Sequence, residues 1–351
     1  MRDTNYPGGI MNINKILDIQ NRIVPEMSDL LLKRYEILKV ISAFQPIGRR
    51  NLSSKLGITE RTMRTEVDKL NEMNLIDIQA SGVALTEYGL YLLSEIHNTF
   101  YYIKNLSDIE LRLMEKLRLK RVAVVSGDSE SDGFAFNDLG KKAAEIVLDL
   151  IKNDTVLGIS GGTTMACTVN QMKRKRGIKN LLILPARGGL SDELEIQANT
   201  IAANMAEKLN AQYKLLHIPD NLDEQELNVL KKNRIISDVL EDIQRIDLLV
   251  FGMGNAANMA ARRNSDKNVF EKIESESLTA EVFGYFFDKD GNVKMQTNSV
   301  GITLENFRTV KNAVGVAAGS SKAEAIYAIS KFNNNFILVT DEAAAKRILE
   351  L

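Results

Sequence analysis

The sequence predicts an α/β protein with an N-terminal winged helix-turn-helix domain and a doubly wound, Rossmann-like α/β domain. Residues 49–74 have the pattern of two short helices joined by a tight turn, and two short apolar runs follow them. From residue 121 onward, strand-like runs alternate with helical segments, which is typical of a parallel sheet covered by helices. A glycine-rich turn after one of these strands indicates where the sheet binds a ligand.

The composition is that of an ordinary globular protein. The 351 residues are 44% hydrophobic and 26% charged, enough chain for two or three domains. The formal net charge of -1 gives no global sign of nucleic-acid binding, so a basic surface has to be local. The single cysteine, Cys167, excludes an internal disulfide and fits a small buried hydrophobe. No apolar run could cross a bilayer and no signal peptide is recognisable, so we expect a cytoplasmic protein with no membrane partner.

Four segments are expected along the chain. Tyr6 to Gly9 are Tyr-Pro-Gly-Gly, so the first segment should be disordered, and Met11 is an alternative start. The segments are a disordered extension (residues 1–10), a winged helix-turn-helix domain (residues 11–87), a helical linker or oligomerisation segment (residues 88–118) and an effector-binding domain (residues 119–351).

A helix over about residues 13–44 should precede the helix-turn-helix. The first helix of that motif spans Arg49–Leu56, Gly57 makes the turn, and Thr59 caps a second helix that runs to Asn74. One side of the second helix is apolar and should pack inward, while donors on its other side reach bases and phosphates. The residues expected to contact DNA are basic or carry hydroxyls: Arg49, Arg50, Arg61, Thr62, Arg64, Thr65 and Lys69.

Local charge also favours DNA at this motif. Between Arg34 and Leu75 the chain has eight Lys or Arg and five acids, in contrast to the near-neutral whole. The runs Leu75–Ile78 and Val83–Leu85, joined by a Ser-Gly turn, predict the hairpin of a winged helix. The alternative is a protein-interaction domain of the same shape, because exposed basic side chains are usually only solvated. Turn, cap, basic face and wing agree with one another, which favours double-stranded operator DNA as the partner.

Residues 86–117 carry an apolar stripe near coiled-coil spacing that includes Leu90, Leu93 and Ile96. Such a stripe is more typical of a dimer interface or a packing surface than of a cofactor site. DNA readers of this shape pair to match a two-fold operator, so we expect a homodimer or homotetramer. We expect His97, in the same stretch, to be structural.

The second domain should contain a parallel sheet, in which ligands bind beyond the carboxyl ends of the strands. An antiparallel hairpin is expected over residues 283–295. Seven strand-like runs predict the sheet: Val122–Val125, Val156–Ile159, Leu181–Pro185, Tyr213–Ile218, Leu248–Phe251, Val314–Ala317 and Phe336–Val339.

The turn Gly158–Met165 ends one of these strands and opens a helix. Gly161 and Gly162 let the backbone approach a ligand, and Thr163 and Thr164 add hydroxyls beside the free N–H groups of the helix N-terminus. This arrangement suits a phosphate. It matches neither G-x-G-x-x-G nor the Lys-bearing P-loop, so a nucleotide is less favoured. A tight turn with an N-cap explains the same residues about as well.

Two further strand ends carry groups suited to anions. Arg187, Gly188 and Gly189 offer an arginine fork and two glycines for a second phosphate. The run Gly319–Lys322 offers hydroxyls, free N–H groups and a lysine. Three side chains could hydrogen-bond sugar hydroxyls: Gln197, Arg262 and Glu281. Any one loop could be only a turn, but together they indicate a phosphorylated sugar or sugar bisphosphate, with no other cofactor and no metal.

The strings Gly161-Gly162-Thr163-Thr164, Pro185-Ala186-Arg187-Gly188-Gly189, Gln197-Ala198-Asn199-Thr200 and Gly319-Ser320-Ser321-Lys322-Ala323-Glu324-Ala325 resemble the SorC-type sugar-binding transcriptional regulators. Three more strings resemble a glycolytic subgroup of that family: Pro46-Ile47-Gly48-Arg49-Arg50, Val124-Val125-Ser126-Gly127-Asp128-Ser129 and Val339-Thr340-Asp341-Glu342. The similarity runs from about residue 25 to the C-terminus. Residues 1–10 have no counterpart in it.

The resemblance implies a repressor of a triose-phosphate operon of glycolysis whose DNA binding is weakened by fructose 1,6-bisphosphate. By the same resemblance, one phosphate would be held by Gly161, Gly162, Thr163, Thr164 and Lys322. The other would be served by Arg187, Gly188 and Gly189. Gln197, Arg262 and Glu281 would lie on or near the sugar.

An enzyme is the rival hypothesis, because the α/β domain also resembles phosphosugar isomerases and glucosamine-phosphate deaminases. Such enzymes need a carboxylate base and a proton carrier at the strand end. The corresponding run here, Gly252–Asn258, has no acid and no histidine. His217, near the end of a strand, is expected to be packed rather than catalytic. We therefore expect no catalytic residues and no turnover.

Overall fold

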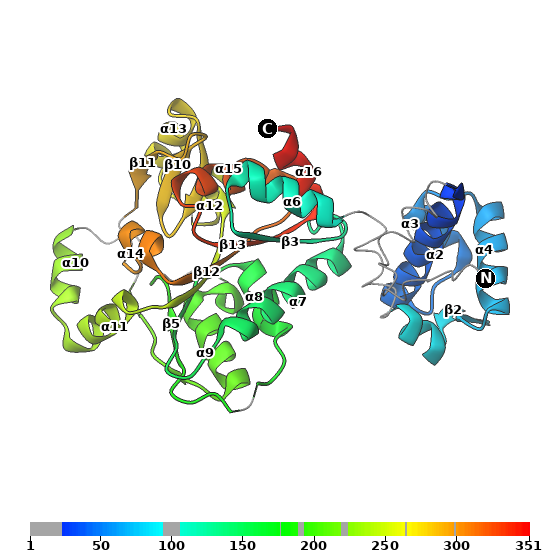
Figure 1. Cartoon of the computed structure of the whole chain (residues 1–351), viewed down its shortest axis with the longest axis horizontal. Helices are drawn as coiled ribbons and strands as arrows, with labels where there is room; N and C mark the ends of the chain where they lie inside the picture. The colour runs from blue at the N-terminus through cyan, green and yellow to red at the C-terminus, as the bar shows by residue number, and fades with distance from the viewer. Residues whose placement is uncertain are drawn as a thin grey trace, which may run out of the picture. The chain divides into compact units, whose positions relative to one another are not determined.

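The computed structural model describes residues 23–93, 106–175, 177–188, 193–218, 224–263, 265–297 and 300–351. Two compact units make up the chain, Met1–Asn105 and Leu106–Leu351 (Figure 1). The expectations for residues 1–10, most of the apolar stripe with His97, and Gly189 lie outside the described residues. Among the helices that the structure describes, none is long and apolar enough to span a membrane.

The first unit has the expected winged helix-turn-helix architecture. Its second motif helix begins at the Thr59 cap, whose hydroxyl accepts the N–H of Thr62. That helix ends two residues earlier than expected, since Asn74 has a φ of 58°. Residues 87–93 are helical. The other elements are α2 (Pro25–Phe44), α3 (Arg49–Leu56), α4 (Glu60–Glu72), β1 (Ile76–Gln79) and β2 (Gly82–Leu85).

The core of this unit is formed by the apolar sides of its helices and wing. Met63, Val67 and Leu70 are fully buried, as the spacing along α4 predicts. Gly82 lets the wing approach the segment before α3, because a Cβ there would lie 2.8 Å from the backbone carbon of Ile47. The hairpin is thereby fixed against the rest of the motif.

Glu66 is an acid that the pattern did not place in the core. It is 5% exposed and accepts hydrogen bonds from Lys33 and Arg34 of α2, both at 2.9 Å. Burial would raise the pKa of Glu66, but these hydrogen bonds and the two positive charges outweigh burial and hold that pKa below its usual value. The salt bridges therefore join α4 to α2.

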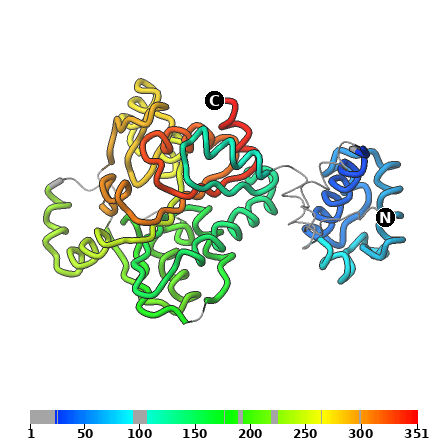
Figure 2. The backbone as a smooth tube through the Cα atoms, viewed as in Figure 1, coloured from blue at the N-terminus to red at the C-terminus, as the bar shows by residue number. Residues whose placement is uncertain are grey.

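The second unit is built on a seven-stranded, all-parallel sheet. Its spatial order is β3-β13-β12-β7-β4-β5-β6, which confirms the doubly wound fold. The first strand of the unit pairs with the last, so the start and end of the unit lie side by side (Figure 2). The strands are β3 (Arg121–Val125), β4 (Val156–Ile159), β5 (Leu182–Pro185), β6 (Gln212–Tyr213), β7 (Leu248–Gly252), β12 (Asn312–Val316) and β13 (Ile337–Asp341).

Helices cover both faces of this sheet. On β7, Leu248 and Val250 face the core formed with α7, α8 and α9, while Phe251 on the other face contacts Phe307 at 4.9 Å between ring centroids. The helices are α6 (Leu106–Leu117), α7 (Gly133–Leu150), α8 (Thr163–Asn170), α9 (Ala198–Leu209), α10 (Glu224–Lys231), α11 (Arg234–Gln244), α12 (Ala256–Arg262), α13 (Lys267–Ser275), α14 (Leu304–Thr309), α15 (Ala323–Phe332) and α16 (Glu342–Glu350). Two short 3-10 helices are η1 (Leu194–Ile196) and η2 (Ser320–Lys322).

A four-stranded antiparallel sheet adds to the second unit. Its order is β11-β10-β9-β8, and the expected hairpin is its β10–β11 pair. Strand β8, which pairs with β9 at Gly254 and Glu281, was not predicted. The strands are β8 (Gly254–Asn255), β9 (Leu278–Val282), β10 (Tyr285–Asp288) and β11 (Val293–Gln296).

Two boundaries differ from the expectation. The strand expected over Tyr213–Ile218 is reduced to β6. The buried Asn199 amide hydrogen-bonds the N–H and C=O of Leu216, which therefore do not pair with a neighbouring strand. Helix α6, expected in a separate linker, instead packs on β3 and α16 with Leu113 and Leu117 buried. It therefore belongs to the second unit.

Candidate functional site

The second unit has a topological switch point between β4 and β7. From β4 the chain proceeds to β5 and β6 at one edge, then returns to β7 on the other side of β4. The loops after these two strands therefore diverge and leave a crevice at their carboxyl ends. The Ser160 hydroxyl bridges the two strand ends by accepting the N–H of Gly252 at 3.0 Å.

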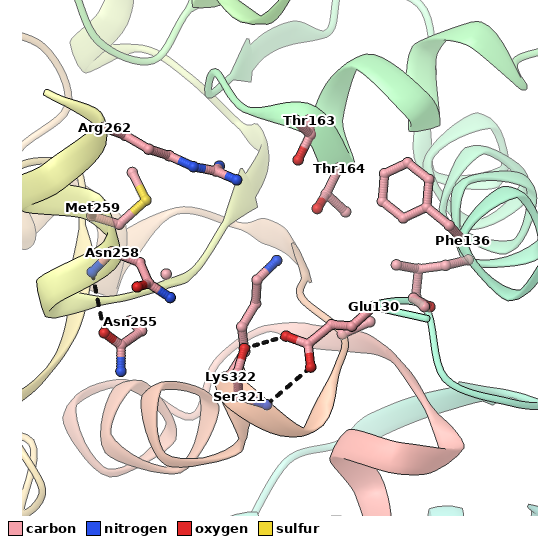
Figure 3. A pocket seen from close by; sticks show the side chains of 14 residues that line it. Glu130, Phe136, Thr163, Thr164, Asn255, Asn258, Met259, Arg262, Ser321 and Lys322 are labelled. Atoms are coloured by element: carbon pink, nitrogen blue, oxygen red, sulfur yellow. Dashed lines mark hydrogen bonds between the residues drawn. The ribbon is translucent and has the colours of Figure 1, made fainter. Parts of the chain in front are cut away.

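A cavity of about 230 Å³ opens at this switch point (Figure 3). Its walls come from the loops that follow β3, β4, β7 and β12, together with α7 and α12. The lining residues are Ser129, Glu130, Phe136, Leu139, Thr163, Thr164, Gly254, Asn255, Asn258, Met259, Arg262, Ala318, Ser321 and Lys322. Four of the residues expected from the sequence therefore meet in one cavity.

The turn after β4 presents a helix N-terminus to the cavity. Gly162 has a φ of 115°, which disfavours any residue with a side chain, and it begins α8 without a side-chain cap. A Cβ on Gly161 would lie 2.8 Å from the carbonyl oxygen of Ile196, so that glycine serves close packing. Thr163 and Thr164 carry their hydroxyls into the cavity (Figure 3). Free N–H groups and two hydroxyls thus point toward one space.

Two cations face this space from the opposite side. The Lys322 side chain extends toward Arg262 and the two threonines (Figure 3). Burial and the positive charge of Arg262 lower the pKa of Lys322, while Glu130 and Asp341 act in the opposite direction. Among the described residues, neither the Lys322 ammonium nor the Arg262 guanidinium has a hydrogen-bond or ion-pair partner. An anion bound between them would relieve their repulsion.

One buried carboxylate holds both the loop after β3 and the turn after β12 that carries Lys322. Asp341, at the end of β13, is 0% exposed. It accepts the N–H of Ser129 at 2.7 Å and the N–H of Gly319 at 3.0 Å, and it also caps α16 through Ala344. Asp341 therefore fixes two walls of the cavity relative to each other.

Arg187 and Gly188 lie beyond the end of β5, outside the cavity lining. Arg187 forms an isolated bridge with Gly301, and Gly188 donates its N–H to the carbonyl of Val300 at 2.8 Å. Since β5 is adjacent to β4, this segment follows the neighbouring strand end. Gln197 precedes α9 and lines neither this cavity nor the groove beside it.

The groove beside the cavity has a volume of about 500 Å³ and shares Phe136 and Thr163 with it. It runs between α7, α8 and the segment around η1. Cys167 is one of its lining residues and is otherwise buried as expected, which raises the pKa of its thiol. The two hollows together extend the space next to the α8 N-terminus.

Glu281, expected on or near the sugar, lies outside the cavity lining. Its carboxylate is 2% exposed, accepts Arg263 Nη2 at 2.9 Å and also accepts the N–H of Gly284. It is absent from the cavity lining, so its observed contacts tie β9 to α12 and to the turn before β10. Arg262, the neighbour of Arg263, is the arginine that lines the cavity.

Several residues of the cavity lining were not among the predicted site residues. Glu130 and Phe136 come from the loop after β3 and from α7, and Asn255, Asn258 and Met259 come from the turn and helix after β7. Each follows a strand end, so the rule that placed Thr163 could have found them. His217, expected to be packed, is instead exposed and absent from the cavity lining.

The residues expected to contact DNA lie on α3 and α4 of the first unit. Arg61, Arg64 and Lys69 are exposed. Thr62 is engaged by the cap, and the Thr65 hydroxyl donates to the carbonyl of Arg61 at 3.2 Å. The other two expected residues, Arg49 and Arg50, form loose ion pairs with Asp68 at 3.8 Å and Glu60 at 3.7 Å.

Two family models match the chain in the order of its two units. One is described as the CggR N-terminal DNA binding domain and matches residues 30–100. The other, "Putative sugar-binding domain", matches residues 101–350. The chain is also 39% identical over 337 residues to the central glycolytic genes regulator of Bacillus subtilis, covering 96% of this chain and 99% of that protein.

The chain belongs to the SorC-type sugar-binding transcriptional regulators, in the group of the central glycolytic genes regulators. A SorC family regulator from Enterococcus faecalis is 33% identical, with a TM-score of 0.65 over 69% of this chain and 99% of that one. The full-length sorbitol operon regulator from Klebsiella pneumoniae, 19% identical, shares the fold with a TM-score of 0.64 over 91% of this chain and 98% of its own. These relatives are named regulators and not enzymes, which agrees with the expectation of no turnover.

Proposed function

We propose that this protein represses glycolytic genes by binding operator DNA through its first unit, and that fructose 1,6-bisphosphate in the second unit weakens this binding. The observation that carries the proposal is the cavity in which Lys322 and Arg262 face the uncapped N-terminus of α8. The name of the Bacillus subtilis relative supplies the glycolytic genes. Neither a resident cofactor nor a metal is part of the proposal.

The cavity suits a phosphate more than a neutral sugar. The helix N-terminus supplies N–H donors and a positive dipole end, Thr163 and Thr164 supply hydroxyls, and Lys322 supplies a charge. Asn255 and Asn258 line the same space and offer amide groups for sugar hydroxyls. A second phosphate could extend into the adjoining groove, which Thr163 also lines.

The first unit suits double-stranded DNA. Its α4 has an apolar side buried in the domain and an outer side with Arg61, Arg64 and Lys69 exposed. Helices of this kind place their N-terminal half in the major groove, and a hairpin wing contacts the backbone beside it. We propose that the protein binds its operator as a homodimer or homotetramer, since a two-fold operator requires paired readers.

Effector control requires a difference in free energy between two states. Fructose 1,6-bisphosphate can weaken the DNA complex only if it binds the DNA-free arrangement of the protein more tightly than the DNA-bound one. The same coupling makes DNA reduce the affinity for the effector by the same factor.

Fluorescence anisotropy of labelled DNA from upstream of the protein's own operon would test the proposal. The titration is made at fixed salt with no sugar, with fructose 1,6-bisphosphate and with fructose 6-phosphate. We expect specific DNA binding that only the bisphosphate weakens, and Thr164→Ala protein that stays on DNA at bisphosphate concentrations that release the native protein. DNA binding that neither sugar alters would remove the effector from the proposal, and no specific DNA binding would overturn it entirely.

A further inference from the structure

Glu130 reaches across the cavity to the turn that precedes α15. It belongs to the loop between β3 and α7, far along the chain from that turn. Its Oε2 accepts the N–H of Ser321 at 3.4 Å, and its Oε1 contacts the Ser321 hydroxyl (Figure 3). A Cβ on Gly319 would overlap this side chain, lying 2.6 Å from Oε1. The carboxylate therefore lies directly on the turn.

The groups that Glu130 contacts are those that a phosphate would use. The turn around η2 has Gly319 at a φ of 93°, the N–H and hydroxyl of Ser321 that Glu130 accepts, and Lys322 next along the chain. A carboxylate has the same sign of charge as a phosphate and accepts hydrogen bonds from the same donors. The chain thus places one of its own anions on the donors of an anion-binding turn.

The main chain around Glu130 is held by hydrogen bonds, whereas its side chain lies at the surface. The N–H of Ser129 is held by Asp341 at 2.7 Å, and the N–H of Glu130 by Asp128 at 2.9 Å. The same Asp341 holds Gly319, so the loop and the turn share one anchor. The Glu130 residue itself is exposed. Its carboxylate can therefore move into water without any displacement of the loop.

We propose that Glu130 is a specificity-determining residue that occupies the N–H and hydroxyl donors of Ser321 until a phosphate group displaces it. A phosphate monoester carries a charge of about -1.5 to -2 at neutral pH and three acceptor oxygens, so it competes with one carboxylate, whereas a neutral sugar does not. The inference rests on the proposed function, since it takes the ligand to be a phosphorylated sugar.

The opposite role for Glu130 would be direct binding of sugar hydroxyls. The two roles predict opposite effects of removing the carboxylate. If Glu130 competes with the ligand, its loss strengthens phosphate binding, and if Glu130 binds the ligand, its loss weakens it. The sign of one affinity change therefore separates them.

Isothermal titration calorimetry of the full chain provides the test, with fructose 1,6-bisphosphate, inorganic phosphate and unphosphorylated fructose as probes. The variants are Glu130→Gln and Glu130→Ala, and the matched control is Glu145→Gln, which removes one exposed acid from α7. Thermal unfolding of each variant verifies that it folds. We expect both Glu130 variants to bind bisphosphate and inorganic phosphate roughly tenfold tighter, because a nearby like charge is removed, with no gain for fructose. The control should match the native protein.

The outcomes separate this inference from the proposed function. Unchanged or weaker phosphate binding by both Glu130 variants overturns the inference. If the native protein still binds the bisphosphate in that case, the proposed effector is unaffected. If the native protein does not bind the bisphosphate but the Glu130 variants bind inorganic phosphate, the inference stands and the proposed effector is wrong. If no protein binds either phosphate probe, both are overturned.

Discussion

The buried carboxylate of Asp341 accepts the backbone N–H of Gly319 at 3.0 Å through both of its oxygens. Gly319 opens the turn that carries Lys322, and Asp341 ends the neighbouring strand, β13. Since Asp341 also accepts the N–H of Ser129, one side chain positions both Lys322 and Glu130 at the cavity. A side chain that binds no ligand is therefore expected to control ligand affinity.

Replacing Asp341 tests this expectation. Asp341→Ala leaves three N–H groups without their acceptor, two of them buried, so we expect the second unit to lose about 2–4 kcal/mol of unfolding free energy. The affinity for fructose 1,6-bisphosphate should fall with it. Urea unfolding and calorimetry measure the two effects. Asp149→Asn, at an exposed position of α7, is the control, and equal stability of the two variants would contradict the role of Asp341.

The ammonium of Lys322 should determine how effector affinity depends on pH. Burial, followed by the charge of Arg262, lowers the pKa of Lys322 from its ordinary 10.5. The lysine therefore loses its proton at a lower pH than an exposed lysine does. We expect the affinity for fructose 1,6-bisphosphate to fall as pH rises through this lowered pKa, below pH 10.5. Calorimetry between neutral and alkaline pH would detect it, and Lys322→Arg, whose guanidinium stays charged, should flatten the profile.

The same shift affects the stability of the ligand-free protein with the opposite sign. Between the folded pKa and the ordinary value of 10.5, the unfolded chain binds more protons at Lys322 than the folded chain. Stability should therefore rise with pH across that window, and Lys322→Met should remove the rise. Thermal unfolding of the two proteins over the same pH range would measure it. A rise that persists in Lys322→Met would belong to another group.

Arg61 and Arg64 should contribute to DNA affinity without affecting the sugar site. Each is exposed on α4 in the first unit, whereas the residues that line the cavity all belong to the second unit. Replacing either by alanine should weaken operator binding by about 1–3 kcal/mol if it contacts a base, or reduce the salt slope by about one if it contacts a phosphate. Anisotropy titrations at several salt concentrations distinguish these cases. Arg112→Ala, an exposed charge on α6, should leave DNA binding unchanged.

Glu66 should make the first unit sensitive to acid. Its two ion pairs hold its pKa below the ordinary 4.5, so their stabilisation is fully present above pH 4.5 and is lost as pH falls through the lowered pKa. Glu66→Gln should cost about 1–3 kcal/mol near neutral pH, because Lys33 and Arg34 lose their shared partner. Chemical unfolding monitored at the first unit would show it. Glu60→Gln, on the exposed side of the same helix, should have no such effect.

Local patterns predicted most of the architecture. The Thr59 cap and the apolar spacing of α4 are local, and the structure has both. The same is true of the strand runs, since a buried parallel strand such as β7 is a continuous apolar segment. Thr163, Thr164, Arg262 and Lys322 meet at one cavity because parallel strands end at the same edge of the sheet.

The remaining details depend on tertiary contacts that no local pattern encodes. Arg262 and Arg263 are adjacent, yet one lines the cavity and the other pairs with the buried Glu281. Glu66 looks like an exposed helical acid until α2 supplies its two cations. The contact between Glu130 and Ser321 is likewise undetectable without the fold, because the two residues are distant in the sequence.

The pairing of β3 with β13 has a consequence for protein synthesis. The second unit cannot complete its parallel sheet until its final strand has left the ribosome. The winged helix-turn-helix of the first unit, by contrast, has a core of its own. We predict that a chain whose translation is halted before β13 still binds DNA but does not bind the sugar phosphate. Pulse proteolysis of arrested nascent chains would check this, and a protected second unit before β13 emerges would refute it.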